Sequence, residues 1–157
     1  MKALSLLQRW ASALFAYIPS PAGALQLKPD ETRHWPMPES LIDQPVAIHA
    51  AKRDTREGRE FWLDVLMRQS RREIYGAAFQ DLGIEKYADL PRGAIIGTVI
   101  FGRSVPTDDC DRMEIAREWG NYGRGRWAWP VLNTHSFKEP VPRIGRQGIF
   151  EWDEVPF

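Results

Sequence analysis

Residues 28–35 read Lys28-Pro29-Asp30-Glu31-Thr32-Arg33-His34-Trp35, and the interpretation of the whole chain depends on this stretch. In a β-strand, successive side chains point to opposite faces. A strand over this stretch therefore places Glu31, Arg33 and Trp35 on one face. That face offers a hydrogen-bond acceptor, a planar fork of five donors and an aromatic ring. Such groups grip a nucleobase, by hydrogen bonds to its edge and by stacking on its face.

Further segments follow in a set order around this stretch. They are Leu4-Ser5-Leu6-x-Gln8-x-Trp10-Ala11-Ser12, Ala47-Ile48-His49-Ala50-Ala51-Lys52, Leu90-Pro91-x-Gly93-Ala94-Ile95-Ile96-Gly97 and Gly148-Ile149-Phe150-Glu151-Trp152. Together with residues 28–35, the ordered series resembles the ASCH domain (activating signal cointegrator homology) family, a branch of the PUA-like barrels, over nearly the whole chain. The resemblance implies an α+β fold, a PUA-like β-barrel of about five to six strands with flanking α-helices, formed by one domain over residues 1–157.

The sequence departs from the family pattern in three places. Arg9 stands where relatives usually have proline, and Gln26 stands where they usually have glycine, two residues before the lysine. Asp43-Gln44-Pro45 replaces an arginine–glycine pair that often precedes the histidine-bearing strand. The first two changes alter the entrance of the pocket more than the fold. The third removes an arginine that could contact phosphate, and so argues against a tight grip on a nucleic-acid backbone.

The resemblance also implies a site. Lys28 corresponds to a lysine that lies at the site in relatives, and Gln8 and Trp10 stand at positions that line the family pocket. If the chain is an enzyme, Lys28 and Glu31 are the catalytic candidates. The residues that we expect to bind nucleic acid or another ligand are Gln8, Trp10, Lys28, Glu31, Arg33, Trp35, His49, Lys52, Tyr122 and Arg126.

Several of these residues also have a purely structural interpretation. Glu31 and Arg33 can form a surface ion pair of little energetic value. Trp35 suits the core about equally well, and Lys52 suits a solvated strand end. A histidine on an apolar strand, such as His49, is more often a core residue with satisfied hydrogen bonds.

The stretch from Trp119 to Trp129 mixes aromatic residues, glycines and arginines. Such a mixture suits base stacking combined with backbone tracking on single-stranded nucleic acid. A tight loop between core tryptophans explains the same composition. We prefer the core interpretation for Trp127 and the binding interpretation for Tyr122 and Arg126.

Composition limits these interpretations. With 157 residues, 43% of them hydrophobic and 27% charged, the chain has the size and make-up of one globular domain. Its formal net charge is zero, whereas proteins that coat nucleic acid are basic because they neutralise phosphates. Nucleic-acid contact must therefore come from a local cluster of charge or from a single base. Arg68, Arg71 and Arg72 on a predicted helix are such a cluster, although charge runs on helices are usually just solvated.

Two further features concern the compartment of the protein. Cys110 is the only cysteine in the sequence, which excludes an internal disulfide and a multi-cysteine zinc site. Its acidic neighbours disfavour a thiolate, so we do not expect it to act as a nucleophile. Gln8 interrupts the apolar run near the N-terminus too early for a signal peptide or a membrane span. We expect a cytoplasmic protein without membrane contact.

Local patterns predict the elements that carry these residues. Strands are expected over residues 4–7, 28–35, 46–51, 94–103, 127–132 and 148–152, with Pro130 at an edge or a bulge. Helices are expected over residues 10–17, 56–82 and 114–118; Gly76 is the candidate break in the second and Gly83 ends it. Residues 20–27 and 36–45 are predicted loops, and residues 137–143 an extended segment. Strands without regular helix alternation favour an α+β barrel over a doubly wound sheet.

Two functional hypotheses follow from these features. The first is a nucleic-acid or nucleotide-binding domain that holds single-stranded RNA, or a modified nucleobase, in a cleft between barrel and helices. The second, implied by the resemblance, is a hydrolase. Some small relatives are amidohydrolases that remove an acyl group from modified cytidine with a lysine base, a threonine three residues later and a remote glutamate. Here Glu31 stands in the threonine position, and Thr32 faces the other way on a regular strand.

Two alternatives complete the set. Related domains also include metal-assisted ribonucleases, for which the run Asp108-Asp109 with Asp111 is a candidate magnesium site, although a solvated turn explains it more simply. Apart from such a magnesium ion, no metal site and no cofactor are expected. The chain can also be a protein-interaction adaptor with Trp62 and Phe79 as its partner patch, although both residues suit the core better.

Overall fold

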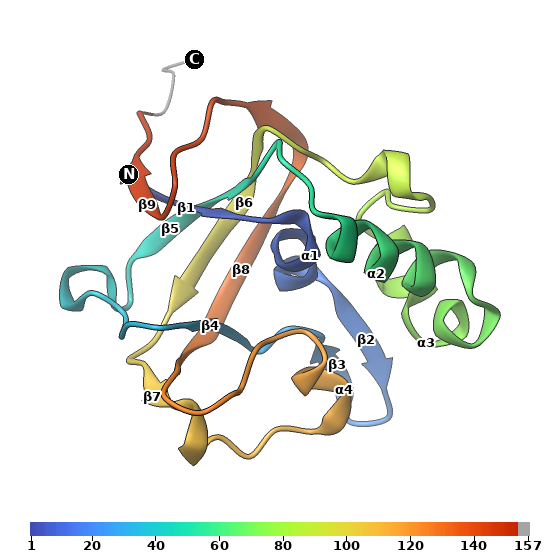
Figure 1. Cartoon of the computed structure of the whole chain (residues 1–157), viewed down its shortest axis with the longest axis horizontal. Coiled ribbons are helices and arrows are strands. Elements are labelled where there is room, and N and C mark those ends of the chain that lie inside the picture. Colours follow the sequence, from blue (N-terminus) through green and yellow to red (C-terminus); the bar gives the residue numbers. More distant parts are fainter. Residues whose placement is uncertain (154–157) are drawn as a thin grey trace.

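The computed structural model describes residues 1–153 and has an α+β architecture, with a large β-sheet, a small hairpin and helices beside them (Figure 1). The large sheet has seven strands, in the order β4-β8-β6-β5-β1-β9 with β7 beside β8. These strands are β1 (Lys2–Leu6), β4 (Asp30–Arg33), β5 (Pro45–Ala50), β6 (Ala94–Phe101), β7 (Val105–Pro106), β8 (Trp127–Pro142) and β9 (Ile149–Glu151). The hairpin consists of β2 (Tyr17–Ser20) and β3 (Gly23–Gln26).

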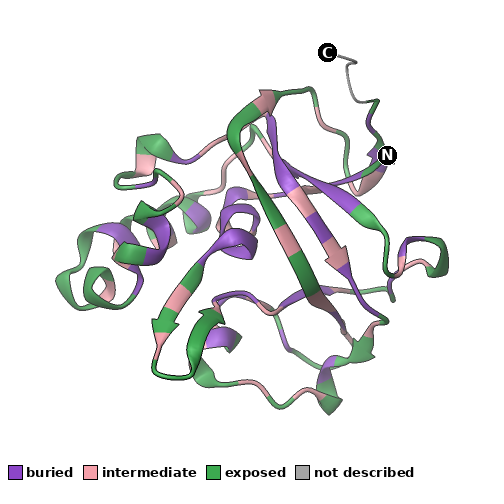
Figure 2. Ribbon diagram, turned by 180° about the vertical axis from the view of Figure 1, so that it is seen from behind, coloured by how far each residue is buried: buried purple, intermediate pink, exposed green. Residues whose placement is uncertain are grey.

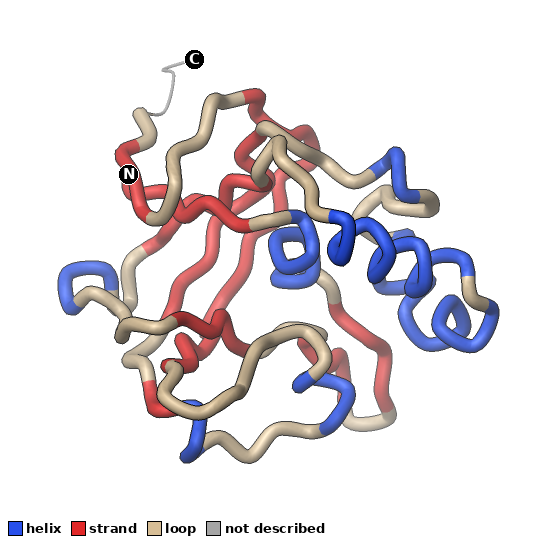
Figure 3. The backbone as a smooth tube through the Cα atoms, viewed as in Figure 1, coloured by secondary structure: helices blue, strands red, loops and turns tan. Residues whose placement is uncertain are grey.

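The large sheet curls into a half-barrel because its longest strand, β8, serves different partners along its length. The first residues of β8 pair with β4 and β7, and the remaining residues pair with β6. The pairing of β6 with β8 shifts register next to Phe101, beside Pro130, and such irregularities bend a strand and increase its twist. In Figure 3, β4 crosses over the other strands instead of extending the sheet flat. This curl brings one end of the sheet towards β1.

Helices surround this sheet on one side and at its ends. They are α1 (Gln8–Ala11), α2 (Arg56–Met67), α3 (Gln69–Gln80) and α4 (Glu114–Arg117), with short 3-10 helices η1 (Ser12–Phe15), η2 (Glu39–Leu41), η3 (Tyr87–Asp89) and η4 (Thr107–Asp109). Helix α2 begins after Thr55, whose side-chain oxygen accepts a hydrogen bond from the Gly58 amide (3.0 Å) and so caps the helix. No helix within residues 1–153 has the length and apolar character needed to cross a membrane.

The core consists of clusters on both faces of the sheet. One joins the sheet to α1 and η1 around Leu14, Phe101 and Trp129, and another joins η1 to α2 and α3 around Trp62 and Phe79. Figure 2 shows the buried residues along the central strands and in the short α1–η1 helix, with exposed residues on the hairpin and the outer helices. Because Trp62 and Phe79 are fully buried, they cannot form the partner patch of an adaptor.

The structure corrects several predicted boundaries in the first half of the chain. The predicted helix over residues 10–17 begins at Gln8 and ends at Phe15, and the predicted loop over residues 20–27 contains most of the β2–β3 hairpin. The long helical segment breaks at Arg68, which has an extended backbone, and Gly76 lies inside α3. Leu66, next to this break, is buried in the second cluster, so tertiary packing overrides the weak preference of a single glycine.

The predicted strand over residues 127–132 is too short. Strand β8 runs on to Pro142 and includes the segment that was predicted only as extended. Pro130 is not at an edge, because β8 pairs with β4 on one side and β6 on the other. Proline lacks a donor but keeps an acceptor, and the Pro130 carbonyl accepts a hydrogen bond from the Gly102 amide (2.9 Å). Proline is tolerated here beside the register shift.

A buried carboxylate ties β4 to the segment between β7 and β8. Asp30 is fully buried and accepts two hydrogen bonds from Arg112 (2.7 and 3.1 Å) and one from the Tyr122 hydroxyl (2.7 Å). Burial, followed by the hydrogen bond to Asp30, raises the pKa of Tyr122. The hydrogen bonds from Arg112 replace the water that the Asp30 carboxylate loses on folding.

Replacing Asp30 by alanine leaves Arg112 partly buried without its carboxylate. We expect Asp30→Ala to lower the free energy of unfolding by about 3 kcal/mol or more, as for other buried pairs that lose one partner. Urea denaturation followed by tryptophan fluorescence measures the change. The control is Glu39→Ala, which removes the exposed ion pair between Glu39 and Arg103 and should change stability little. Equal effects of the two substitutions would contradict this role of Asp30.

Candidate functional site

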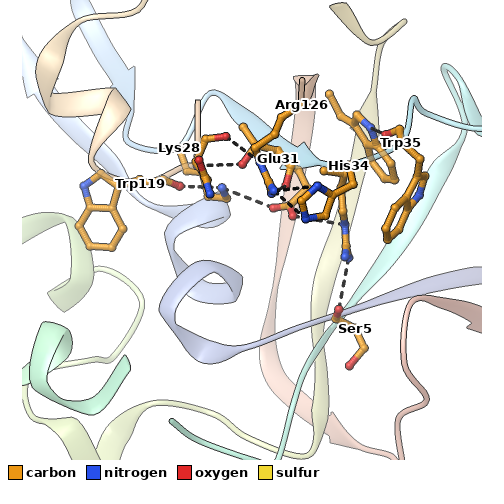
Figure 4. Close-up of polar contacts among 11 residues, drawn as sticks. Ser5, Lys28, Glu31, His34, Trp35, Trp119 and Arg126 are labelled. Carbon is orange, nitrogen blue, oxygen red and sulfur yellow. Dashed lines mark hydrogen bonds and ion pairs between the residues drawn. The ribbon is translucent and has the colours of Figure 1, made fainter. Parts of the chain in front are cut away.

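The candidate site lies where the β4 end of the curled sheet meets β1 and helix α1 (Figure 4). Lys28 lies two residues before the start of β4 and is only 1% exposed. Its Nζ atom donates a hydrogen bond to the Trp119 carbonyl oxygen (2.6 Å), lies 3.4 Å from Glu31 Oε2 and lies 5.1 Å from the ring centroid of Trp10. A carbonyl, a carboxylate and an aromatic face thus surround the ammonium group in place of water.

Glu31 and Arg33 project from the same face of β4, as strand alternation predicts. The Arg33 Nε atom lies 3.5 Å from Glu31 Oε1, and its NH2 atom donates to the Ser5 carbonyl oxygen in β1 (3.5 Å). Glu31 is buried and Arg33 is partly buried, so the interpretation as a surface ion pair is wrong. Arg33 connects the β4 end of the sheet to the edge of β1.

Two atoms of this group have unused hydrogen-bonding capacity. Glu31 Oε2 and Arg33 Nε are buried, and neither has a hydrogen-bond partner within residues 1–153. The separations of 3.4 and 3.5 Å from their charged neighbours exceed those of normal charge-assisted hydrogen bonds. Buried polar atoms are nearly always bonded. The site therefore retains a buried acceptor and a buried donor whose hydrogen-bonding capacity the described residues do not fill.

Trp35 lies beyond the end of β4 rather than on it, because the strand ends at Arg33. The side chain is not in the core, since Trp35 is 43% exposed. The Arg33 guanidinium carbon lies 5.1 Å from the ring centroid, in a cation–π contact. The Trp35 carbonyl accepts a hydrogen bond from Trp129 Nε1 (3.0 Å), which fixes the backbone at this point. An accessible aromatic ring thus adjoins the guanidinium group.

Gln8 and His49 are buried, and their polar atoms are occupied. The Gln8 side chain accepts from the Ser12 amide (3.2 Å) and donates to the Pro91 carbonyl. His49 Nδ1 lies 3.0 Å from Ser5 Oγ, and Nε2 lies 2.9 Å from the Arg143 carbonyl oxygen. Because a carbonyl can only accept, Nε2 carries the proton. His49 is thus placed as the satisfied core histidine that its apolar strand favours.

Lys52 and Tyr122 are brought to very different environments. Lys52 is exposed directly after β5. Tyr122 is buried, with its hydroxyl bonded to Asp30, so its ring is packed inside the protein rather than open for stacking. Trp10 is partly buried, and both the Lys28 ammonium and the Arg9 guanidinium lie close to its ring, at 5.1 and 4.5 Å from the centroid.

Arg126 lies beside the site but is engaged with its own surroundings. Its guanidinium donates to the carbonyl oxygens of Asn121 and Thr32, both at 3.1 Å, and its NH1 atom lies 3.0 Å from a ring nitrogen of His34. Figure 4 shows Arg126 and His34 in the same part of the site as Glu31. Arg126 therefore holds the segment before β8 against β4.

Burial is the main influence on the electrostatics of the site. It lowers the pKa of the Lys28 ammonium below its ordinary value of 10.5, although the nearby Glu31 carboxylate opposes this shift. A lysine with a lowered pKa has a larger neutral fraction, which can accept a proton. The site thus pairs a buried amine with a buried carboxylate.

The other residues considered as catalytic candidates do not form part of this site. Thr32 faces away from Glu31, and its hydroxyl accepts a hydrogen bond from the Asn121 amide (2.9 Å). Burial raises the pKa of the Cys110 thiol, as expected for an unreactive cysteine. Within residues 1–153, no three or more histidine, cysteine, aspartate or glutamate side chains gather in a way that could hold a metal ion, so the acidic run around Asp109 gains no support as a magnesium site.

Sequence reasoning missed the groups that complete the site. The Trp119 and Ser5 carbonyl oxygens hold Lys28 and Arg33, but a backbone carbonyl carries no residue-specific signal. The buried Asp30 was also missed, since it faces away from Glu31 and shares its charge. These contacts are visible only in the folded structure, where β4, β1 and the segment around Trp119 lie together.

No protein-family model matches the chain, and no curated protein matches it.

The lowered pKa of Lys28 predicts a dependence of stability on pH. In the pH range between this lowered value and 10.5, the unfolded chain binds more protons than the native state, so stability rises with pH. We expect the difference in unfolding free energy between wild type and Lys28→Met to shift in favour of wild type from pH 7 to pH 10. Urea denaturation at both pH values measures it, and taking the difference cancels the titration of groups common to both proteins.

The matched control for this experiment is Lys138→Met, which removes an ammonium group that is exposed on β8. A shift for Lys28→Met no larger than that for Lys138→Met would show that burial of Lys28 does not perturb its titration.

Proposed function

We propose that this chain is a nucleobase-binding domain of the PUA-like barrel class, as its resemblance to ASCH domains implies. It holds one base of single-stranded RNA, or a modified nucleoside, against Glu31, Arg33 and Trp35. The observation that carries the proposal is the pair of buried, unpartnered polar atoms, Glu31 Oε2 and Arg33 Nε, beside an accessible tryptophan ring.

The chemistry of this pair suits the edge of a base. A carboxylate accepts hydrogen bonds from an amino or imino N–H group, and a guanidinium donates to a ring nitrogen or a carbonyl oxygen. Each of the four bases offers such a donor beside such an acceptor. Glu31 and Arg33 can therefore read a base edge together, and an exocyclic amino group like that of cytosine is the natural partner of Glu31.

Trp35 supplies the second requirement, a surface for stacking. Base–aromatic stacking contributes about 1–3 kcal/mol per base. The Arg33 guanidinium beside the ring, at 5.1 Å, adds a planar cation that can share the stack. Recognition of one base by a local pocket also agrees with a formal net charge of zero.

A hydrolase is the second candidate, and the buried Lys28–Glu31 pair favours it. A buried lysine with a lowered pKa beside a carboxylate is an arrangement that acid–base catalysis can use. Because Glu31 replaces the threonine nucleophile of the related amidohydrolases, the reaction would use water activated by the pair rather than a covalent intermediate. Turnover of acylated cytidine that is lost in Lys28→Met and insensitive to a chelator would support this candidate over a metal-assisted ribonuclease.

Trp35→Leu tests the binding proposal without disturbing the core, because Trp35 is partly exposed. We expect the substitution to weaken binding of nucleosides or short single-stranded RNA about tenfold or more, from the loss of stacking, while the free energy of unfolding changes little. Isothermal titration calorimetry measures the affinity.

Tyr17→Leu is the matched control, since Tyr17 is an exposed aromatic residue on the hairpin strand β2. Glu31→Gln should weaken binding about tenfold through the loss of a charged acceptor. If Trp35→Leu and Glu31→Gln both bind as tightly as the parent and Tyr17→Leu, the pocket is not where we place it.

A further inference from the structure

A basic loop lies near the candidate site. Residues 143–148 connect β8 to β9 and read Arg-Ile-Gly-Arg-Gln-Gly, so the loop has two arginines and no acidic residue. Arg143 and Arg146 are both exposed. Within residues 1–153 neither makes an ion pair with a carboxylate, and the same holds for Lys52. We call Lys52, Arg143 and Arg146 the basic rim.

The loop is held firmly against the two strands that it crosses. The Arg143 amide donates to the Gly93 carbonyl (2.9 Å), and the Arg143 carbonyl accepts from His49 in β5 (2.9 Å). Gly145 packs so closely on the His49 ring that a Cβ atom there would collide with the imidazole. A loop held in this way loses little conformational freedom when it binds a partner.

The same contacts place the loop near the pocket. The Gly148 carbonyl at the end of the loop accepts from the Ser5 amide (3.0 Å), and the Ser5 carbonyl accepts from Arg33 (3.5 Å). Both groups of Ser5 point to the same edge of β1. Lys52 lies near the start of the loop, since its side chain borders Gly93, the residue that bonds to Arg143. The end of the loop thus lies next to Ser5, the residue that Arg33 contacts.

Two carboxylates in the segments next to the basic rim form ion pairs with other basic residues. Asp54 pairs with Arg92 (3.2 Å), and Glu151 pairs with Lys2. The rim therefore keeps a local positive field on a chain with a formal net charge of zero. Ile144, at the tip of the loop between the two arginines, is 92% exposed. An apolar side chain there can lie against a sugar or a base while its neighbours meet the adjacent phosphates.

We infer that the basic rim binds the phosphates of a single-stranded nucleic acid whose neighbouring base occupies the Glu31–Arg33–Trp35 pocket. The inference rests on the proposed function and specifies its ligand as a polynucleotide strand rather than a free nucleoside. The position of the rim near a pocket for one base favours a single strand, because bases in a duplex are not accessible for such stacking.

The test compares a fluorescein-labelled 12-nucleotide single-stranded RNA of mixed sequence with free nucleosides, using the variant Arg143→Ala/Arg146→Ala. Each phosphate contact on a single strand contributes about 0.7 to the slope of log affinity against log salt. From 50 to 300 mM KCl, we expect the double variant to lose about 1.4 of this slope and on the order of tenfold in affinity at 0.1 M salt. Its affinity for nucleosides should stay unchanged.

Lys86→Ala/Lys138→Ala removes the same charge from exposed positions at the start of η3 and on β8 and should keep the parental slope. Equal slopes for the parent and Arg143→Ala/Arg146→Ala would overturn the inference but leave the pocket intact. Nucleoside binding without RNA binding, or binding of anionic lipid vesicles in place of RNA, would also overturn it. Absence of both RNA and nucleoside binding would overturn the proposed function itself.

Discussion

An ammonium group enclosed away from water is the constraint on which the site depends. Three parts of the chain converge on Lys28 and replace the water around its ammonium group. They are β4 with Glu31, the segment after α4 with the Trp119 carbonyl, and helix α1 with Trp10. This convergence requires the curl of the sheet, which in turn depends on β8 changing partners along its length. The desolvation of Lys28 acts against folding. The aromatic and aliphatic clusters around α1, α2 and α3 supply the apolar burial that offsets it.

The arrangement differs from a structural ion-pair network in one respect. The Asp30 carboxylate accepts short hydrogen bonds from Arg112 and Tyr122. Around Glu31, the charged neighbours lie at 3.4 and 3.5 Å, and buried hydrogen-bonding capacity is left over. The two carboxylates are adjacent in sequence and lie on opposite faces of β4. Both Asp30 oxygens accept hydrogen bonds, whereas Glu31 Oε2 has no hydrogen-bond partner within residues 1–153. Functional sites often retain such unsatisfied polar groups at a cost in stability.

The candidate site could be predicted in part. Alternation along a strand correctly placed Glu31 and Arg33 together, because the strand period depends on backbone geometry alone. Trp35 was assigned to the same strand, but pairing between β4 and β8 ends at Arg33 and Trp127, so its position follows from where the partner strand ends. The binding interpretation of Tyr122 rested on composition, whereas the structure buries the side chain against Asp30. Composition does not indicate which of two neighbouring carboxylates a tyrosine will reach.

The sequence by itself determined where most strands of the large sheet and the longer helices lie, because β-branched runs and helical spacing act over a few residues. It thereby determined the α+β class, the central strands β5 and β6, and the shared face of Glu31 and Arg33. Only the tertiary structure decided that Lys28 is buried, that the long helical segment breaks at Arg68, and that loop 143–148 lies near the candidate site. These outcomes depend on contacts between residues far apart in sequence, such as Arg33 with Ser5 and His49 with Arg143. Burial and hydrogen bonding are settled by the partners that the fold brings together, which local patterns do not encode.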